Sequence, residues 1–309
     1  MNRPTLARAL VTGGAGFVGS HLVERLIADG WQVLVIDDLS HGTTANVPNE
    51  ARVEPPDIAV DDIDAVVERW RPRVVHHLAA QTSVPASMEA PLRDLAVNVT
   101  GTHRMAAAAH RARAQRFVFV SSGGAIYGEV RRPATETTLP APSSYYGVHK
   151  LAAEGHVVLS GVAYAIARPM NIYGPRQTSG LEGAVVAAFV RQALAGLPLT
   201  IDGDGSQTRD FVHVRDVVEA LVRLGQVDGP VGTWNVASGR RISIGRLAET
   251  VEDAVGAKLS RVRRPSRRGD VRDSGASAAR LRQLGWRPMV PLSRGIQELL
   301  DIAGGPRER

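Results

Sequence analysis

Short apolar runs alternate with helix-like segments along the first half of the chain. Apolar runs of strand length occur at residues 7–12, 32–37, 73–79, 116–121 and 163–168. Between them, apolar residues recur with the period of an amphipathic helix at residues 17–29, 61–70, 91–112 and 146–160. Strands that alternate with helices are typical of βαβ units. The sequence therefore predicts an α/β protein with a Rossmann-type doubly wound parallel sheet.

The regular alternation ends after Pro169. Turn-rich sequence then flanks one predicted helix at 184–195. We expect the sheet domain to occupy residues 1–168 and a smaller C-terminal substrate-binding lobe to occupy residues 169–309. Within that lobe, the segment 212–237 contains a helix pattern and a strand pattern, and we expect it to rejoin the sheet domain.

Composition limits the chemistry that is open to this chain. Its 309 residues include no cysteine, which excludes disulfides, thiolate nucleophiles and zinc–thiolate sites, and no metal site is expected. No apolar run reaches the roughly 18 residues that a membrane-spanning helix needs, so no membrane partner is expected. The start of the chain has no signal-peptide pattern, which makes the cytoplasm the expected compartment.

The charge balance is mildly basic. Thirty-seven basic residues against 31 acidic residues give a net charge of +6. The one dense basic run, Arg261–Arg272, contains no aromatic side chain that could stack on a base, so no nucleic-acid partner is expected. A positive charge of this size suits an anionic small-molecule substrate.

A glycine-rich turn, TGGAGFVG, begins at Thr12 directly after the first predicted strand. Glycines let the backbone approach a pyrophosphate, and the start of the following helix offers amide donors to it. The expected cofactor contacts in this turn are Gly13, Gly16, Phe17, Val18 and Gly19.

Asp37 ends the next predicted strand, 18 residues after Gly19. A carboxylate at this place can accept hydrogen bonds from both ribose hydroxyls of NAD and would repel the 2′-phosphate of NADP. We therefore expect NAD as the cofactor, bound in part by Asp37 and Asp38.

Tyr146 and Lys150 are spaced i, i+4 on a predicted helix, so their side chains emerge on one face. An ammonium group stabilises a phenolate and lowers the pKa of a nearby tyrosine, which makes Tyr146 a candidate general base. Lys150 can also donate to the ribose. Ser121 and Ser122 end the preceding strand, where ligands of open α/β sheets bind. One of these hydroxyls is expected to meet the reacting oxygen.

Seven ordered motifs carry a resemblance to a known family. The chain resembles the extended short-chain dehydrogenase/reductases of the nucleotide-sugar epimerase and dehydratase branch, above all the UDP-glucose (UDP-galactose) 4-epimerases. The matching segments are Thr12–His21, Val75–Gln81, Asn98–Thr102, Phe119–Ser122, Tyr146–Lys150, Arg168–Arg176 and Gly205–His213.

The resemblance implies further contacts with the cofactor. Asp57 and Ile58 would lie near the adenine, although Pro55 and Pro56 replace the family's usual small or acidic residues and leave this contact open. The other implied cofactor contacts are Leu78, Ala79, Ala80, Gln81 and Asn98.

The resemblance also implies substrate contacts. These are Ser121, Ser122, Gly123, Asn171, Arg176, Arg209, Arg267 and Asp270. Arg209 and Arg267 would bind the nucleotide diphosphate, which arginine can grip with two parallel hydrogen bonds. Counting back from Tyr127 aligns the family's catalytic hydroxyl with Gly123, whereas counting along the strand gives Ser122. Because glycine has no hydroxyl, Ser122 is preferred and Ser121 is the alternative.

Together these features predict an enzyme, a UDP-hexose 4-epimerase that inverts carbon 4 through a transient 4-keto sugar and bound NADH. UDP-glucose and UDP-galactose are the first choice of substrate. Related dehydratases remove a carbon 5 proton with an acidic residue beside the catalytic hydroxyl, and Gly123 and Gly124 occupy that place here. The alternatives are a UDP-glucuronate or UDP-N-acetylhexosamine 4-epimerase, a nucleotide-4-keto-sugar reductase, and a noncatalytic NAD-sensing module.

Two expectations concern size and assembly. Ser274 matches a position where sugar-specific relatives carry a bulky tyrosine, so we expect room for an N-acetyl group at carbon 2 or a carboxylate at carbon 6, the latter beside Arg176.

The family also implies a homodimer through the helices at 91–112 and 146–160.

Overall fold

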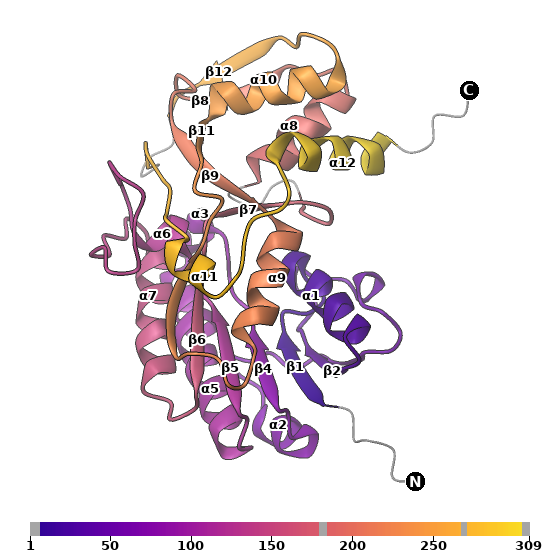
Figure 1. Ribbon diagram of the computed structural model, residues 1–309, viewed down its shortest axis with the longest axis vertical. Coiled ribbons are helices and arrows are strands. Elements are labelled where there is room, and N and C mark those ends of the chain that lie inside the picture. Colours follow the sequence, from indigo (N-terminus) through magenta and orange to yellow (C-terminus); the bar gives the residue numbers. More distant parts are fainter. Residues whose placement is uncertain (1–6, 179–183, 267–270, 305–309) are drawn as a thin grey trace. The chain divides into compact units, whose positions relative to one another are not determined.

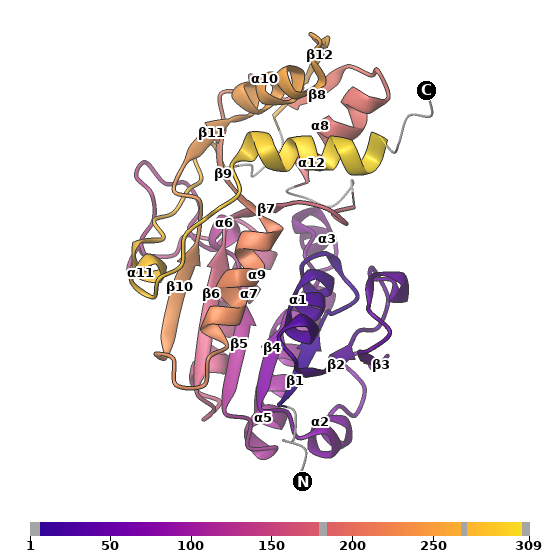
Figure 2. The ribbon, with the colours of Figure 1, turned by 45° about the vertical axis from the view of Figure 1, so that its right-hand side comes forward.

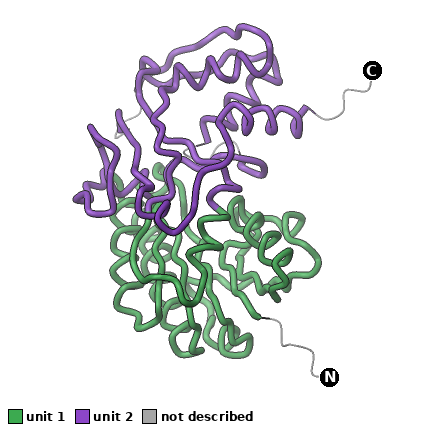
Figure 3. The backbone as a smooth tube through the Cα atoms, in the orientation of Figure 1, with its two compact units in different colours: residues 1–122, 144–168, 218–234 green, residues 123–143, 169–217, 235–309 purple. Residues whose placement is uncertain are grey.

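The chain is divided into two compact units in a computed structural model that describes residues 7–178, 184–266 and 271–304 (Figure 3). Unit 1 comprises Met1–Ser122, Ser144–Arg168 and Val218–Trp234. Unit 2 comprises Gly123–Ser143, Pro169–Val217 and Asn235–Arg309.

A seven-stranded sheet forms the centre of unit 1, in the order β10-β6-β5-β4-β1-β2-β3 (Figure 1). The strands are β1 (Arg8–Thr12), β2 (Gln32–Ile36), β3 (Arg52–Glu54), β4 (Val74–His77), β5 (Arg116–Val120), β6 (Tyr164–Pro169) and β10 (Gly232–Val236). All pairings from β3 through to β6 are parallel. The apolar runs are buried because helices cover both faces. The predicted Rossmann-type sheet is confirmed. Strand β3 was not expected, since it has only one apolar residue.

Helices lie on both faces of this sheet. Figure 2 shows α1 (Phe17–Ala28) and α9 (Val214–Leu224) on one face, and α2 (Asp64–Trp70), α5 (Thr102–Arg111) and α7 (Tyr145–Val158) on the other. The second face carries a core in which alanines of α5 and α7 pack against Phe117 and Phe119 of β5. Two short elements, the 3₁₀ helix η1 (Thr44–Asn46) and α3 (Val84–Glu89), lie in loops beyond β2 and β4.

The single helix expected at 91–112 is interrupted. The α-helix α4 (Pro91–Leu95) leads into a π-helical segment, η2 (Ala96–Gly101), before α5 begins. A π turn adds a residue without erasing the apolar pattern, so periodicity alone does not reveal it. Such segments occur often at functional sites, and this one contains Asn98.

Unit 2 is built from two small sheets and five helices in the described part of the chain. One sheet has the order β11-β9-β7, and the other pairs β12 with β8. The strands are β7 (Asn171–Tyr173), β8 (Leu199–Asp202), β9 (Thr208–His213), β11 (Arg241–Ser243) and β12 (Arg261–Arg264). The helices are α6 (Gly123–Ile126), α8 (Val185–Leu194), α10 (Ile244–Val255), α11 (Ala279–Gln283) and α12 (Leu292–Gly304). Helices α8, α10 and α12 enclose the core of this unit.

The segment Gly123–Ser143 groups with unit 2, although the sequence placed it in the sheet domain. Its contacts explain the difference. The amide of Ala134 donates to the carbonyl of Gly275 (2.9 Å), and the Tyr127 hydroxyl donates to Oδ1 of Asn235 (2.7 Å). Such long-range contacts leave no local signal in the sequence. The segment that returns to unit 1, Val218–Trp234, is shorter than the expected 212–237.

No helix in the described ranges is long and apolar enough to span a membrane.

Candidate active site

The turn between β1 and α1 requires glycine at two positions. Gly13 has a φ of 69°, and a Cβ there would lie 2.8 Å from the amide nitrogen of Ala79. A Cβ on Gly19 would lie 2.0 Å from the carbonyl oxygen of Gly13. Gly16 precedes α1 without a side-chain cap, so the first amides of α1 are available to a phosphate. The expected contacts in this turn, Phe17 and Val18 included, all lie together.

Asp37 follows β2 and is 7% exposed. Its Oδ2 accepts a hydrogen bond from the amide of Ala15 (2.9 Å), and its Oδ1 accepts one from the amide of Leu39 (2.9 Å). Each carboxylate oxygen can accept a second hydrogen bond. Asp37 therefore fixes the glycine-rich turn and keeps acceptor capacity for ribose hydroxyls. Asp38 is exposed, and its Oδ1 accepts from the amide and hydroxyl of Ser40 (3.0 and 2.7 Å).

Asp57 and Ile58 lie in a turn that α5 and the end of η2 hold in place. The Asp57 carboxylate accepts a hydrogen bond from the amide two residues ahead (2.8 Å). Ile58 packs closely on Gly101, because a Cβ added to Gly101 would lie 2.9 Å from Cδ1 of Ile58. Arg104 donates to the carbonyls of Ile58 (3.1 Å) and Asp61. Sequence reasoning did not identify Arg104, because nothing local links it to this turn.

A hydrogen-bond chain crosses the carboxyl edge of the sheet. The Thr12 hydroxyl accepts from the amides of Leu78 and Ala79 (both 3.1 Å) and lies 2.7 Å from Nδ1 of His77. Since a hydroxyl has a single proton and two amides already donate to it, Thr12 must donate to Nδ1. The proton of His77 is therefore on Nε2, and the start of the loop after β4 is fixed. Ala80 is half-buried in the same loop.

The chain continues from His77 into the π-helical segment. Nε2 of His77 donates to the Thr102 hydroxyl (3.0 Å), which donates to the carbonyl of Asn98 (2.7 Å). Burial, and after it the charge of Lys150, lowers the pKa of His77 to about 3, so the ring is neutral. Nδ2 of Asn98 donates to the carbonyl of Gln81 (2.9 Å), and its buried Oδ1 has no partner among the described residues. A ligand donor would satisfy that oxygen.

Gln81 turns its side chain into the protein. Its Nε2 donates to Oδ1 of Asp94 (2.6 Å) and to the carbonyl of Ser83 (2.9 Å), and its Oε1 accepts from the amide of Ser83. The other oxygen of Asp94 lies 2.6 Å from Nδ1 of His149 on α7. The Gln81 side chain therefore joins the loop after β4 to α4 and α7, and the expected cofactor contact of this residue stays a prediction.

Helix α7 carries Tyr146 and Lys150. Ser144 caps the helix by accepting from the amide of Gly147 (3.2 Å), and the amide of Tyr146 donates to the Ser87 hydroxyl (3.1 Å). Tyr146 is half-buried, whereas Lys150 is 2% exposed. Both residues lie in the first half of α7, which begins close to the carboxyl edge of the sheet. Their i, i+4 spacing puts both side chains on one face of the helix.

The buried environment of Lys150 disfavours its protonated form. Burial lowers the pKa of Lys150 to about 7, while the nearby carboxylates of Glu154 and Asp94 act to raise it. Its Nζ also lies 4.3 Å from the centroid of the Phe119 ring, which favours the cation. The protonation of this lysine therefore depends on a small number of neighbours.

Ser121 and Ser122 follow β5, but they differ in their surroundings. Ser121 is 3% exposed, and its hydroxyl donates to Oε1 of Glu154 (2.6 Å). Ser122 is half-buried. Glu154 also accepts from Nε and Nη2 of Arg168 (2.9 and 2.6 Å), a forked pair inside the unit. No local sequence pattern predicts this pair, since its members lie 14 residues apart.

Unit 2 carries the remaining candidates. Asn171 begins β7, and its buried Oδ1 has no partner among the described residues. Arg209 on β9 donates from Nη1 to the carbonyls of Thr208 (2.8 Å) and Arg272 (3.3 Å), which orients its guanidinium. Arg176 is exposed and has a φ of 67°, a left-handed conformation that is uncommon for a residue with a Cβ.

Four further positions in unit 2 complete the set of candidates. Gly123 is buried at the start of α6. Ser274 is 4% exposed, and its amide donates to the carbonyl of Thr208 (3.2 Å). Arg267 and Asp270 lie outside the described residues. Within the described ranges, no group of three or more histidine, aspartate or glutamate residues could hold a metal ion.

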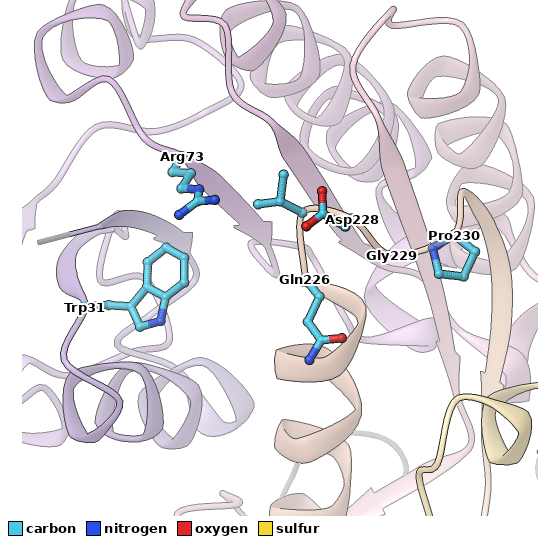
Figure 4. Close-up of a pocket in the computed structure, with 8 residues that line it drawn as sticks. Trp31, Arg73, Gln226, Asp228, Gly229 and Pro230 are labelled. Carbon is cyan, nitrogen blue, oxygen red and sulfur yellow. The ribbon is translucent and has the colours of Figure 1, made fainter.

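A cavity of ≈ 490 Å³ lies elsewhere in unit 1 (Figure 4). Its walls include Trp31, Arg73 and the chain from Gly225 to Pro230. Trp31 and Arg73 precede β2 and β4, so the cavity is at the amino edge of the sheet. The glycine-rich turn, Asp37 and Tyr146 are all at the carboxyl edge, and this cavity has no part in that chemistry.

The sequence is similar to a family of known proteins. Residues 9–237 match the model of the "NAD dependent epimerase/dehydratase family". A UDP-glucose 4-epimerase from Mycolicibacterium smegmatis is 41% identical over 306 residues, which cover 96% of this chain and 98% of that protein.

Two solved structures are similar over nearly their whole length. UDP-glucose 4-epimerase from Thermus thermophilus in complex with NAD has a TM-score of 0.91 and 37% identity, covering 97% of this chain and 99% of that one. UDP-glucose 4-epimerase from Thermotoga maritima with UDP-glucose has a TM-score of 0.91 and 36% identity, covering 95% and 97%.

The chain belongs to the NAD dependent epimerase/dehydratase family. It is an NAD-dependent sugar epimerase, and NAD is its cofactor. The residues of unit 1 fit that cofactor. The glycine-rich turn admits a pyrophosphate, Asp37 keeps acceptor capacity for the ribose, and the buried Oδ1 of Asn98 has no partner in the described part of the chain.

Proposed function

We propose that this chain is a UDP-hexose 4-epimerase and that UDP-glucose and UDP-galactose are its substrates. The observation that carries the proposal is the Tyr146–Lys150 pair on α7, in the same unit as the glycine-rich turn and Asp37. Near full-length similarity to three UDP-glucose 4-epimerases supports the choice of sugar.

Tyr146 accepts the proton of the sugar 4-hydroxyl in this proposal, and Lys150 donates to the ribose and stabilises the phenolate. When bound, NAD supplies the acceptor and later the donor of the hydride at carbon 4. The resulting 4-keto sugar turns about its diphosphate linkage while arginines hold the nucleotide. Tyr146 then returns the proton to the oxygen. No redox equivalent is consumed, because the hydride that leaves carbon 4 returns to its opposite face.

Ser122 is the proposed partner of the reacting oxygen. The Ser121 hydroxyl is buried and donates to the Glu154 carboxylate, so its proton is committed inside the protein. We expect Ser122→Ala to lower turnover by about 100-fold, a size typical of losing one donor to a developing charge. Ser121→Ala, the matched control, should have the smaller effect. Equal losses in the two variants would remove this assignment.

The proposed reaction is epimerisation without a following dehydration. A dehydratase needs an acidic group near the catalytic hydroxyl to remove the carbon 5 proton, and residues 122–127 contain no carboxylate. We infer that the 4-keto sugar is only reduced again.

We also propose that Arg209 and Arg267 hold the diphosphate. Arg209 is oriented by hydrogen bonds from Nη1 to two backbone carbonyls, and a guanidinium can grip a diphosphate through two parallel hydrogen bonds. Asn171 and Arg176 are proposed substrate contacts.

A homodimer through α4, α5 and α7 is a further part of the proposal. Leu92 on α4 is 79% exposed and Leu159 at the end of α7 is 87% exposed, and Val148 and Val158 of α7 are also exposed. A second copy would cover these apolar side chains. Light scattering at micromolar protein should give twice the mass of one chain, and a monomer would contradict the proposal.

The proposed function is tested by incubating the purified protein with a panel of UDP-sugars without added cofactor and separating the products. We expect UDP-glucose and UDP-galactose to interconvert, and NAD to be released when the protein is denatured. If only UDP-glucuronate or only a UDP-N-acetylhexosamine is turned over, that sugar replaces UDP-glucose and UDP-galactose as the substrate. A need for stoichiometric NADH would make the chain a reductase, and no turnover with NAD bound would favour a sensing module.

A further inference from the structure

A buried charged pair lies one helical turn beyond Lys150. Glu154 and Arg168 are each 6% exposed, and two hydrogen bonds of 2.9 and 2.6 Å join their side chains. The Ser121 hydroxyl adds a third bond to the same carboxylate (2.6 Å). A buried ion pair is often no more stabilising than apolar side chains of the same volume. Stability alone therefore does not account for a charge at this place.

The charge of Glu154 acts on Lys150. Residues four apart on a helix are neighbours, so α7 itself fixes the separation of the carboxylate and the ammonium. Of the charges that favour protonated Lys150, Glu154 is the largest and Asp94 of α4 the second. Arg168 of β6 neutralises part of the Glu154 charge but is not among the groups that act directly on the lysine.

The other groups around Lys150 cannot replace Glu154. His77 of β4 is neutral, and the Phe119 ring of β5 carries no net charge. Asp94 raises the pKa of Lys150 less than Glu154 does, and its two oxygens bond to His149 and Gln81 (both 2.6 Å). Glu154 is thus the main counter-charge to an ammonium that burial disfavours.

We propose that Glu154 is a positioning residue that keeps Lys150 protonated. This inference rests on the proposed function, in which the ammonium stabilises the Tyr146 phenolate. Arg168 and Ser121 hold the carboxylate in place, and neither residue touches the reacting atoms in this scheme.

The consequence for Tyr146 has a definite sign. With a neutral side chain at 154, Lys150 loses its proton at a lower pH. The phenolate of Tyr146 then lacks its cation, so Tyr146 titrates at a higher pH. A purely structural role of Glu154 would lower activity at every pH without moving this titration.

The test is a near-ultraviolet titration of the NAD-bound protein, which follows phenolate absorbance without any substrate. The signal of Tyr146 is the difference between each protein and the same protein carrying Tyr146→Phe. We expect Glu154→Gln to raise the midpoint by about one pH unit, the size that loss of a close charge partner produces. Glu154→Asp keeps the charge and should recover most of the shift.

Unit 2 offers a matched control in Glu252 of α10. This carboxylate is 3% exposed and pairs with Lys258 (3.0 Å) and Arg261 (3.0 and 3.1 Å). Glu252→Gln removes a buried paired charge that is not on α7, and the Tyr146 titration should stay at the wild-type midpoint.

Glu154→Gln removes the carboxylate that pairs with buried Arg168 and can fail to fold. The double variant Glu154→Gln/Arg168→Met leaves no unpaired buried charge at this place, and we expect the same upward shift from it. The proposal is overturned if these variants titrate with the wild type, or if Glu252→Gln shifts Tyr146 as far. A clear shift in a protein that epimerises no UDP-sugar would overturn the proposed function and leave the role of Glu154 standing.

Discussion

Unit 1 and unit 2 hold their candidate residues in different ways. In unit 1, Tyr146 and Lys150 are on one long helix, and Asp37 and the glycine-rich turn follow buried parallel strands. A hydrogen-bond chain from Thr12 to Asn98 joins β1, β4, α5 and η2. In unit 2, Asn171 and Arg209 are on strands of a small three-stranded sheet, and Arg176 is on a turn with a left-handed backbone.

We propose that residues of unit 1 carry out the chemistry and residues of unit 2 recognise the substrate. Groups that exchange protons and hold NAD need fixed separations, which regular elements and buried networks provide. Groups on the small sheet and turns of unit 2 can vary with the sugar without disturbing the seven-stranded sheet of unit 1. We therefore expect changes in unit 1 to lower turnover and changes in unit 2 to alter binding and substrate range.

The largest effect should come from Tyr146→Phe. Loss of a general base typically lowers turnover by about 100-fold to 10,000-fold, and the dissociation constant for UDP-sugar should change little because the arginines of unit 2 are intact. Steady-state kinetics and calorimetry measure the two quantities. Tyr145→Phe is the control, since it removes the same atom from an exposed neighbour on α7. Retention of most activity in Tyr146→Phe would end the catalytic assignment.

Lys150→Met should lower turnover less steeply, by about 10-fold to 1,000-fold at neutral pH, because the base is still present. Without the cation the phenol ionises at higher pH, so the residual activity should recover on the alkaline side. The pH dependence of kcat is the measurement. A uniform loss across pH would mean that Lys150 only grips the ribose.

Arg209→Leu should weaken UDP-sugar binding by about 10-fold to 100-fold, the usual worth of a hydrogen bond to a charged group. Turnover at saturating substrate should stay close to wild type, because binding of this kind is the same in the ground and transition states. Arg240→Leu removes an exposed arginine of the same unit and serves as the control. A fall in kcat with unchanged affinity would place Arg209 in the chemistry and break the comparison.

Ser274→Tyr should have the smallest effect on UDP-glucose itself and should reduce activity on bulkier sugars by about 10-fold. Ser274 is buried, so a melting temperature must accompany the kinetics, because overpacking costs about 1–3 kcal/mol. An unchanged ratio of activities in a folded variant would exclude Ser274 from the sugar pocket.

Most strands and helices of unit 1 could be predicted from the sequence for a physical reason. The glycine-rich turn, Asp37, Tyr146 and Lys150 have fixed spacings along regular elements, and such spacings survive as sequence patterns. The π-helical segment at Asn98 was missed because one inserted residue leaves the apolar period almost unchanged.

Long-range partners could not be found in this way. Glu154 contacts Arg168 across 14 residues of chain and Ser121 across 33, and nothing in the sequence marks these three residues as partners of one another. The bond between the Gln81 side-chain amide and Asp94 likewise joins residues 13 positions apart, and the expected cofactor contact of Gln81 stays a prediction. For Arg267 and Asp270 the expected roles stay predictions, since both lie outside the described residues.

The central claim is that Tyr146 moves only an oxygen-bound proton while the hydrogen on carbon 4 leaves and returns as hydride. The most direct test is to incubate the protein with UDP-glucose in deuterium oxide, without added cofactor, and to examine the product by mass spectrometry and NMR. We predict UDP-galactose with no deuterium on any ring carbon. Deuterium at carbon 4, or at carbon 3 or carbon 5 beside the transient ketone, would contradict the account.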